Sequence, residues 1–313
     1  MAPLVSVITP FHDAGPLLRD AIDSVRAQRK ARWELLLVDD GSTDESSAIA
    51  RRAADEDPDR IRVLEHDGHR NRGPSASRNL GLSRARGELV AFLDADDVFL
   101  PFKLERQVAL LEANPRVGML HGKALLWHAE GIEDVPVGGD GVIPLPTAAG
   151  TVCEPPELLR RLLVDEDSHP PPCSLLIRRE VCERIGGFDE RFRFYEDTIF
   201  LARAYLEVAV LVSGDCSAVY RRHAASSSHV AALAGDYDPY APNPAERAFL
   251  EWLEGHLSEA GHADGAVHRA LRRRLEPYRR PRIHRMRRAA TRIRRGLARR
   301  AGAAASRAAG RPA

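Results

Sequence analysis

Three aspartates follow an apolar run closely enough to bind a divalent cation together. Asp94, Asp96 and Asp97 come directly after the apolar segment 89–93. Carboxylates so close together repel one another unless a cation lies among them, and oxygen ligands of this kind suit Mg²⁺ or Mn²⁺. Such an ion would hold a diphosphate. The alternative is an acidic helix N-terminus that favours the dipole of a helix beginning near Pro101.

A second acidic pair and a basic residue extend this pattern. Asp39 and Asp40 end the apolar run 35–38, and either carboxylate could accept a hydrogen bond from a base N–H or a ribose hydroxyl. The alternative is a helix cap formed with Asp44. Arg78 could reach a phosphate or a carboxylate from its helix, or it could be a solvated residue paired with an acid at the sheet edge.

A third acidic pair, Glu196 and Asp197, begins a predicted helix. Acids at this position commonly stabilise the helix dipole. A general base needs only reach and a suitable pKa, so Asp197 could deprotonate a hydroxyl if the chain folds back to the other acids.

The elements that must position these acids alternate between strands and helices. Apolar runs predict strands at 4–9, 35–38, 61–65 and 89–93, and helical spacing of apolar residues predicts helices at 16–29, 44–57 and 74–86. The strands of an open α/β sheet end at one edge, where ligands bind. The sequence therefore predicts an α/β fold, with a doubly wound, mostly parallel sheet flanked by helices.

The later elements are less regular. We expect a helix that begins after Pro101 and ends at 114, and a strand at 117–127. A loop-rich stretch at 129–172 contains one predicted helix at 157–164. A strand at 174–177 and helices at 180–185, 198–207 and 245–257 follow.

Charge divides the chain of 313 residues, whose net charge is +1, into an acidic body and a basic tail. Residues 269–313 hold 17 of the 46 basic residues and one of the 45 acids, so the tail carries +16 and the body −15. An acidic body argues against nucleic acid as a partner. The spacing of the four cysteines matches neither a zinc site nor a disulfide framework, and no apolar run approaches the ~20 residues of a membrane span, so we expect a cytoplasmic protein.

Five motifs in order resemble family 2 glycosyltransferases with the GT-A fold, over about residues 4–225. They are residues 5–10 (VSVITP), 38–44 (VDDGSTD), 76–81 (ASRNLG), 94–97 (DADD) and 196–197 (ED). The resemblance implies an inverting glycosyltransferase that moves a sugar from a nucleotide-diphosphate donor, a UDP-sugar above all, to a hydroxyl of a glycan or lipid-linked acceptor. It also implies an Mn²⁺ or Mg²⁺ cofactor.

The resemblance assigns roles to individual residues. It places the nucleobase at Thr9, Pro10, Phe11 and Asp40, with Asp39 nearby, and it places Arg78 near the nucleotide. Asp94 would contact the ribose or the metal, and Asp96 and His223 would bind the metal. Asp197 would be the catalytic base. Phe11 and His12 stand where the family usually has tyrosine and asparagine, so Phe11 could stack on a base without a hydroxyl. This departure leaves the nucleobase open.

The same reading divides the chain into a GT-A domain at 1–228, with a nucleotide-binding half (1–128) and an acceptor half (129–228), a helical extension at 229–268, and an Arg-rich tail at 269–313 that is helical or partly disordered. The tail would either meet an anionic membrane on its inner face or fold back on the acidic body. The alternatives for the whole chain are a catalytically silent nucleotide-sugar-binding protein and a nucleotidyltransferase. The second would need a glycine-rich basic loop where residues 10–13 read PFHD.

Overall fold

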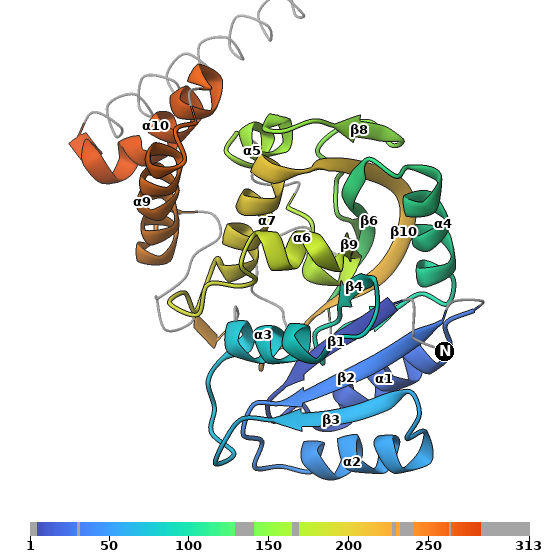
Figure 1. The fold of residues 1–313 in the computed structure, drawn as a ribbon. Coiled ribbons are helices and arrows are strands. Elements are labelled where there is room, and N and C mark those ends of the chain that lie inside the picture. Colours follow the sequence, from blue (N-terminus) through green and yellow to red (C-terminus); the bar gives the residue numbers. More distant parts are fainter. Residues whose placement is uncertain are drawn as a thin grey trace, which may run out of the picture. The chain divides into compact units, whose positions relative to one another are not determined.

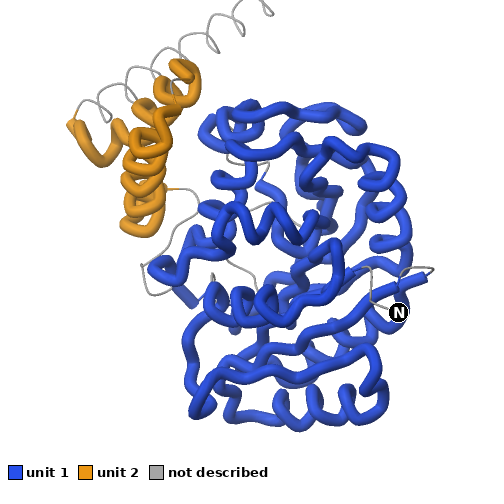
Figure 2. The backbone as a smooth tube through the Cα atoms, in the orientation of Figure 1, with its two compact units in different colours: residues 1–237 blue, residues 238–313 orange. Residues whose placement is uncertain are grey.

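A computed structural model describes residues 5–29, 32–128, 141–164, 169–226, 230–231, 241–262 and 264–282. The chain forms two compact units, residues 1–237 and 238–313 (Figure 2). The first unit extends nine residues beyond the predicted domain end at 228. The second unit begins within the predicted helical extension (229–268) and includes the predicted tail (269–313).

The N-terminal half of unit 1 is a parallel sheet with helical crossovers, as predicted (Figure 1). Its strands lie in the order β3-β2-β1-β4, and each neighbouring pair is parallel. The predicted strand 61–65 has the observed bounds, and the other predicted elements differ by one to three residues at their ends. The elements are β1 (Val5–Phe11), α1 (Gly15–Arg26), β2 (Trp33–Asp39), α2 (Ser46–Glu56), β3 (Ile61–Glu65), α3 (Pro74–Arg84) and β4 (Leu89–Phe92).

Two layers of helices cover this sheet because successive strand residues point to opposite faces. Every residue of β1 and β2 is buried. Val7 packs in the core with Leu18 of α1, whereas its neighbour Ile8 meets α3. The approach to α3 is close, because a Cβ on Gly81 would lie 2.4 Å from the Cγ2 atom of Ile8. The glycine therefore allows α3 to lie directly on the sheet.

The second half continues the same sheet with mixed strand directions. The full order is β3-β2-β1-β4-β9-β6-β10-β5, in which β9 is antiparallel to β4 and β6, and β6 is parallel to β10. The α/β fold class with a sheet flanked by helices is thus confirmed. The elements are β5 (Val98–Phe99), α4 (Lys103–Ala113), β6 (Val117–His128), β7 (Gly141–Val142), β8 (Thr151–Cys153), α5 (Glu157–Leu162), the 3₁₀ turn η1 (Pro172–Ser174), β9 (Leu175–Arg178), α6 (Arg179–Arg184), α7 (Glu196–Glu207) and β10 (Ala209–Arg222).

The strand β10 has no counterpart among the predicted elements. Its register against β6 shifts between Val212 and Cys216, where Ser213, Gly214 and Asp215 interrupt the apolar pattern. Such an irregularity bends a strand and hides its period of two. Beyond the shift, β10 pairs with β5, which brings its carboxyl end beside the loop that carries Asp94–Asp97.

Unit 2 contains α9 (Pro244–Glu259) and α10 (Gly265–Arg279). Both helices begin at a side-chain cap, because Asn243 accepts from the N–H of Glu246, and Asp264 accepts from two N–H groups of α10. The predicted boundary at 268/269 falls inside α10, and residues 283–313 lie outside the described residues. No helix among the residues described is long and apolar enough to span a membrane.

Candidate functional site

The loop after β4 keeps two of its aspartates partly exposed and buries the third. The side chains of Asp94 and Asp96 are 25% and 29% exposed, whereas Asp97 is fully buried. The backbone N–H of Arg221 donates to Asp97 Oδ1 at 3.0 Å. Burial, together with the charges of Asp96 and Asp94, raises the pKa of Asp97 well above its usual value. Asp97 therefore joins the loop to β10, and Asp94 and Asp96 have the side-chain exposure that a ligand needs.

The buried guanidinium of Arg78 links this loop to α7. Its Nη2 lies 2.7 Å from Asp94 Oδ1, its Nη1 lies 3.0 Å from Glu196 Oε1, and the guanidinium stands 5.1 Å from the ring centre of Phe188. Only 4% of the Arg78 side chain is exposed. Arg78 thus pairs with a sheet-edge acid, as in the alternative hypothesis, but that hypothesis was wrong about solvation because the side chain is buried, and a second acid from α7 shares the cation.

The pair Glu196 and Asp197 forms the first turn of α7, after Tyr195 in a left-handed conformation (φ 62°). Burial, aided by the charge of Asp197, raises the pKa of Glu196 to about 7 against the opposing effect of Arg78. Burial also favours a higher pKa for Asp197, but the hydrogen bond and charge of His169, with smaller contributions from other groups, lower it to about 2. Asp197 is therefore ionised across the physiological pH range.

The end of β10 supplies a histidine to the aspartate loop. His223 Nε2 lies 3.0 Å from Asp96 Oδ2, as the sequence prediction of a shared site requires. The preceding Arg221 is clamped, because its Nη1 donates to Asp20 Oδ2 of α1 at 2.7 Å and its Nε donates to the carbonyl of Asp96. These contacts fix the position of His223 against the loop.

The acids at the end of β2 order the neighbouring loops. Asp40 accepts from the backbone N–H groups of Arg72 at 2.7 Å and Gly73 at 2.9 Å. Asp39 accepts from the N–H of Ser42 at 2.8 Å. Gly41 between these contacts adopts a φ of +80°, a conformation that favours glycine.

Residues Thr9, Pro10 and Phe11 end β1 at the same edge, because Phe11 pairs with Asp39 in the register of β1 and β2. The hydroxyl of Thr9 is buried without a hydrogen-bond partner among the described residues. Phe11 is 3% exposed and packs in the hydrophobic core. The expectation that its ring stacks on a base therefore has little support, because the core already covers that ring.

A metal ion at this edge would rely on few protein ligands. Within the described residues, no group of three or more His, Cys, Asp and Glu side chains is arranged to hold a metal ion. Asp96 and His223 offer one carboxylate and one imidazole, while Arg78 occupies an oxygen of Asp94. Mg²⁺ bound to phosphates commonly takes one or two carboxylates and fills its shell with phosphate oxygens and water. The donor set fits a cation shared with a diphosphate.

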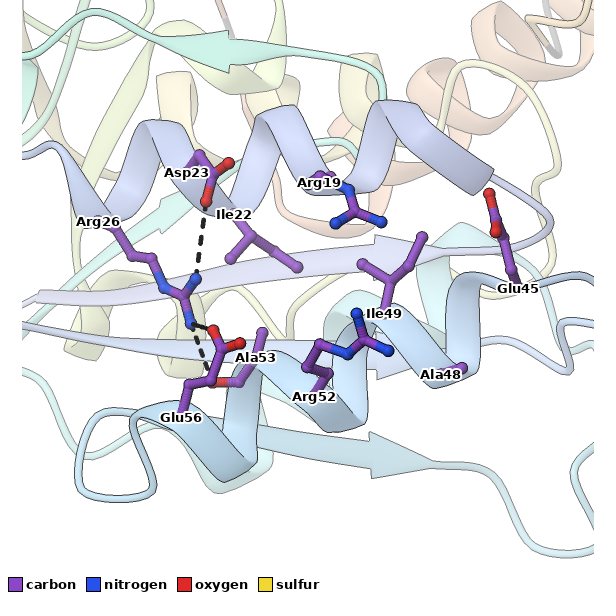
Figure 3. A pocket seen from close by; sticks show the side chains of 10 residues that line it. All are labelled: Arg19, Ile22, Asp23, Arg26, Glu45, Ala48, Ile49, Arg52, Ala53 and Glu56. Carbon is purple, nitrogen blue, oxygen red and sulfur yellow. Dashed lines mark hydrogen bonds and ion pairs between the residues drawn. The ribbon is translucent and has the colours of Figure 1, made fainter.

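A separate hollow of about 360 Å³ lies between α1 and α2 (Figure 3). Charged side chains surround it, and Arg26 of α1 pairs across it with Glu56 of α2 at 2.9 Å and with Asp23 of its own helix at 3.7 Å. None of the predicted site residues lines this hollow. The acidic sheet edge is therefore the candidate site.

Two contacts of the site could not be read from sequence. His169, which approaches Asp197, lies in the loop-rich stretch before three prolines, where no periodicity marks it. His66 lies 2.9 Å from Ser77 Oγ and 3.5 Å from Asp40 Oδ1, and it stands in the polar segment 65–72 (EHDGHRNR), where no pattern distinguishes it. Both depend on partners that are distant in the chain.

Comparisons with known proteins agree with this geometry. The model of glycosyl transferase family 2 matches residues 6–122. An uncharacterised glycosyltransferase of Nostoc sp. is 32% identical over 235 residues, which make up 74% of this chain and 68% of that protein.

Two solved structures share the fold. TarS 1–349 of S. aureus, solved in complex with UDP-GlcNAc, is 19% identical with a TM-score of 0.63 over 89% of this chain and 74% of that one. The mannosyltransferase PcManGT of Pyrobaculum calidifontis, solved with GDP-Man and Mn²⁺, is 20% identical with a TM-score of 0.50 over 90% of this chain and 82% of that one. With its GT-A fold and its family 2 relatives, the chain belongs to glycosyltransferase family 2.

Proposed function

We propose that this glycosyltransferase moves a sugar, with inversion at the anomeric carbon, from a UDP-sugar to a hydroxyl of a glycan or lipid-linked acceptor. The observation that carries the proposal is the link Asp94–Arg78–Glu196, which holds the aspartate loop and the first turn of α7 at one sheet edge. A donor diphosphate at Asp96 and an acceptor at Asp197 would thereby share one site.

Asp197 would act as the general base. The acceptor oxygen attacks the anomeric carbon, the bond from that carbon to the leaving diphosphate breaks on the opposite face, and Asp197 takes the hydroxyl proton. The carboxylate is 28% exposed and ionised, as this role requires. A carboxylate with so low a pKa can take the proton only as the attacking hydroxyl becomes acidic in the transition state. The transfer would therefore be concerted with the attack.

The donor would lie along the acidic edge. Thr9 and Asp40 would receive the base, because the buried hydroxyl of Thr9 has no hydrogen-bond partner among the described residues and could bind it. Asp94 would face the ribose or the metal, and Asp96 with His223 would hold Mn²⁺ or Mg²⁺ on the diphosphate. That ion, when bound, supplies Lewis-acid stabilisation of the leaving group. TarS was solved with UDP-GlcNAc and PcManGT with GDP-Man and Mn²⁺, which supports a nucleotide-sugar donor and a divalent ion.

The proposal also includes peripheral contact with an anionic membrane through the Arg-rich tail. Described residues 269–282 carry seven arginines and one acid, so the basic character begins within α10. Each basic residue near an anionic surface contributes about 1 kcal/mol to binding. Such contact would bring the enzyme to lipid-linked acceptors.

The test is a panel of UDP-GlcNAc, UDP-glucose, UDP-galactose and GDP-mannose, each with Mn²⁺, read by thermal stabilisation and by release of the nucleotide diphosphate. A ligand that binds only the native state raises its stability. We expect Asp96→Ala to abolish metal-dependent stabilisation and release. Asp197→Asn should keep the metal-dependent thermal stabilisation, but its rate of nucleotide diphosphate release should fall at least about 100-fold, the lower end of the range for loss of a general base. Near-normal release by Asp197→Asn would refute its role as the base.

A further inference from the structure

His169 approaches the proposed base from outside α7. Its Nε2 lies 3.4 Å from Asp197 Oδ2 and 3.5 Å from Thr198 Oγ1. The residues that follow His169 are Pro170, Pro171 and Pro172, and the carbonyl of Pro171 accepts from both the N–H and the hydroxyl of Ser174. Prolines have a fixed φ, so this backbone holds the imidazole on a stiff support.

The two oxygens of Asp197 are held in different ways. Oδ1 accepts from the N–H and the hydroxyl of Thr198, the next residue of the same helix, at 2.6 and 3.2 Å. Among the described residues, the hydrogen-bond partner of Oδ2 is His169. Rotation of the carboxylate is therefore limited on one side by α7 itself and on the other side by an imidazole from a separate segment.

We propose that His169 is a positioning residue for the transfer reaction, which donates its Nε2–H to Asp197 Oδ2 and so sets the plane in which the base meets the acceptor hydroxyl. The inference rests on the proposed role of Asp197. A general base must lie within hydrogen-bond reach of the proton that it removes, and small errors in placement are costly in rate. The imidazole supplies that placement without contacting the reacting atoms.

Among the described residues, Thr198 Oγ1 is a second hydrogen-bond neighbour of His169 Nε2, whereas the nearby Arg78 and His121 do not hydrogen-bond to Asp197 Oδ2. Arg78 neutralises the neighbouring Glu196 and Asp94, so its charge is shared among three acids rather than committed to Asp197. His121 is 1% exposed, and its ring nitrogens have no partner among the described residues. Burial, and to a smaller degree the charge of His169, lower the pKa of His121 to about 4, so that ring is neutral at pH 7.

Kinetics with the best donor of the panel and water as acceptor test the proposal. His169→Ala should lower kcat about 10- to 100-fold, the scale for a misplaced catalytic group, with donor KM and Mn²⁺-dependent thermal stabilisation within twofold of wild type. His169→Gln should recover most of that loss, because its amide Nε2–H replaces the imidazole donor. His268→Ala is the matched control, since His268 contacts the carbonyl of His262 within unit 2, and it should leave kcat unchanged.

Two further measurements separate this proposal from the assignment of the base. In an Asp197→Asn background, His169→Ala should cause no further loss, because the two residues act through one carboxylate. The long-range ¹H–¹⁵N spectrum of the imidazole, assigned by its absence in His169→Gln, should show the Nε2–H tautomer whether or not the enzyme turns over.

The proposal is overturned if His169→Ala retains kcat within twofold, if His169→Gln is as impaired as His169→Ala, or if the spectrum shows the Nδ1–H tautomer. Near-normal release of the nucleotide diphosphate by Asp197→Asn would instead refute the role of Asp197 as general base. The tautomer measurement would still test the contact between His169 and Asp197. The two failures are thus distinguishable.

Discussion

Replacement of the buried cation in Arg78→Met is expected to be among the most destabilising changes in unit 1. Methionine keeps an unbranched stem beside the ring of Phe188 but removes the partner of Asp94 and Glu196. Breaking a buried ion pair by removing one partner costs about 3–5 kcal/mol, because the remaining charge is buried without compensation. Here two carboxylates lose their partner, so we expect the upper part of that range at pH 8.

The loss should shrink as the pH falls. Burial already raises the pKa of Glu196 to about 7 and raises the pKa of Asp94, while Arg78 opposes both shifts. Without Arg78 these pKa values rise further above those of the unfolded chain. A raised pKa in an acid means that the folded state binds more protons, so its stability is greatest at low pH and falls as the pH rises. The difference between wild type and Arg78→Met should therefore widen from pH 5 to pH 8.

Urea unfolding followed by circular dichroism, with EDTA present, measures this difference at each pH. Arg72→Met is the matched control, because Arg72 is 59% exposed and pairs with Glu190 at 3.4 Å, and an exposed pair contributes less than about 1 kcal/mol. Adding Glu196→Gln to Arg78→Met should restore part of the lost stability. A loss below about 1 kcal/mol at pH 8 would contradict the reasoning, since a buried pair costs several times more to break, and so would a loss that does not depend on pH.

Two further predictions concern other charges. Burial lowers the pKa of Lys103 from 10.5 to about 7, so the unfolded chain keeps this proton to higher pH than the folded chain does. The free energy of unfolding should therefore rise between pH 7 and pH 10, and Lys103→Met should flatten that rise in urea titrations. An unchanged slope would show that Lys103 titrates normally. Deleting residues 283–313, which leaves α10 complete, should release the protein from phosphatidylglycerol vesicles in cosedimentation, and undiminished binding would rule out this part of the tail as the membrane contact.

The parallel half of the fold was predictable because its signals are local. An apolar run followed by an amphipathic stretch specifies a buried strand and its crossover helix, and strand 61–65 was located to the residue. The strand β10 lacked such a signal because the polar residues 213–215 interrupt its period. The bounds of α10 were not predictable either, since its arginines and the internal Pro277 resemble a solvated tail, for which only a helical or partly disordered state is predicted.

The acids of the candidate site could be predicted from the sequence, but the hydrogen bonds and ion pairs that hold them could not. The rule that strands of an α/β sheet end at one edge brings together Asp40, Asp94 and Asp96 without any knowledge of their partners. It does not bring Asp197 there, because α7 does not follow a parallel strand of that edge: α6 precedes it, and the strand before α6 is β9, which is antiparallel to β4 and β6. The contact of Arg78 with Glu196 spans 118 residues, and no local pattern records a contact of that separation.

The acids of this edge fall into two groups according to the hydrogen-bond or ion-pair partners of their carboxylate oxygens. These partners determine which acids can bind a ligand. Backbone N–H groups hold Asp39, Asp40 and Asp97, so these three fix loops and have little exposed surface. Side chains from other segments contact Asp94, Asp96 and Oδ2 of Asp197, whose Oδ1 also accepts from the backbone N–H of Thr198, and each of these three side chains is about a quarter exposed. Because side chains can shift when a diphosphate or a metal arrives, whereas a loop backbone cannot without refolding, the second group is the one that can exchange a partner for a ligand. The same distinction explains why Asp40, which we propose to receive the nucleobase, can offer only its remaining lone pairs to it.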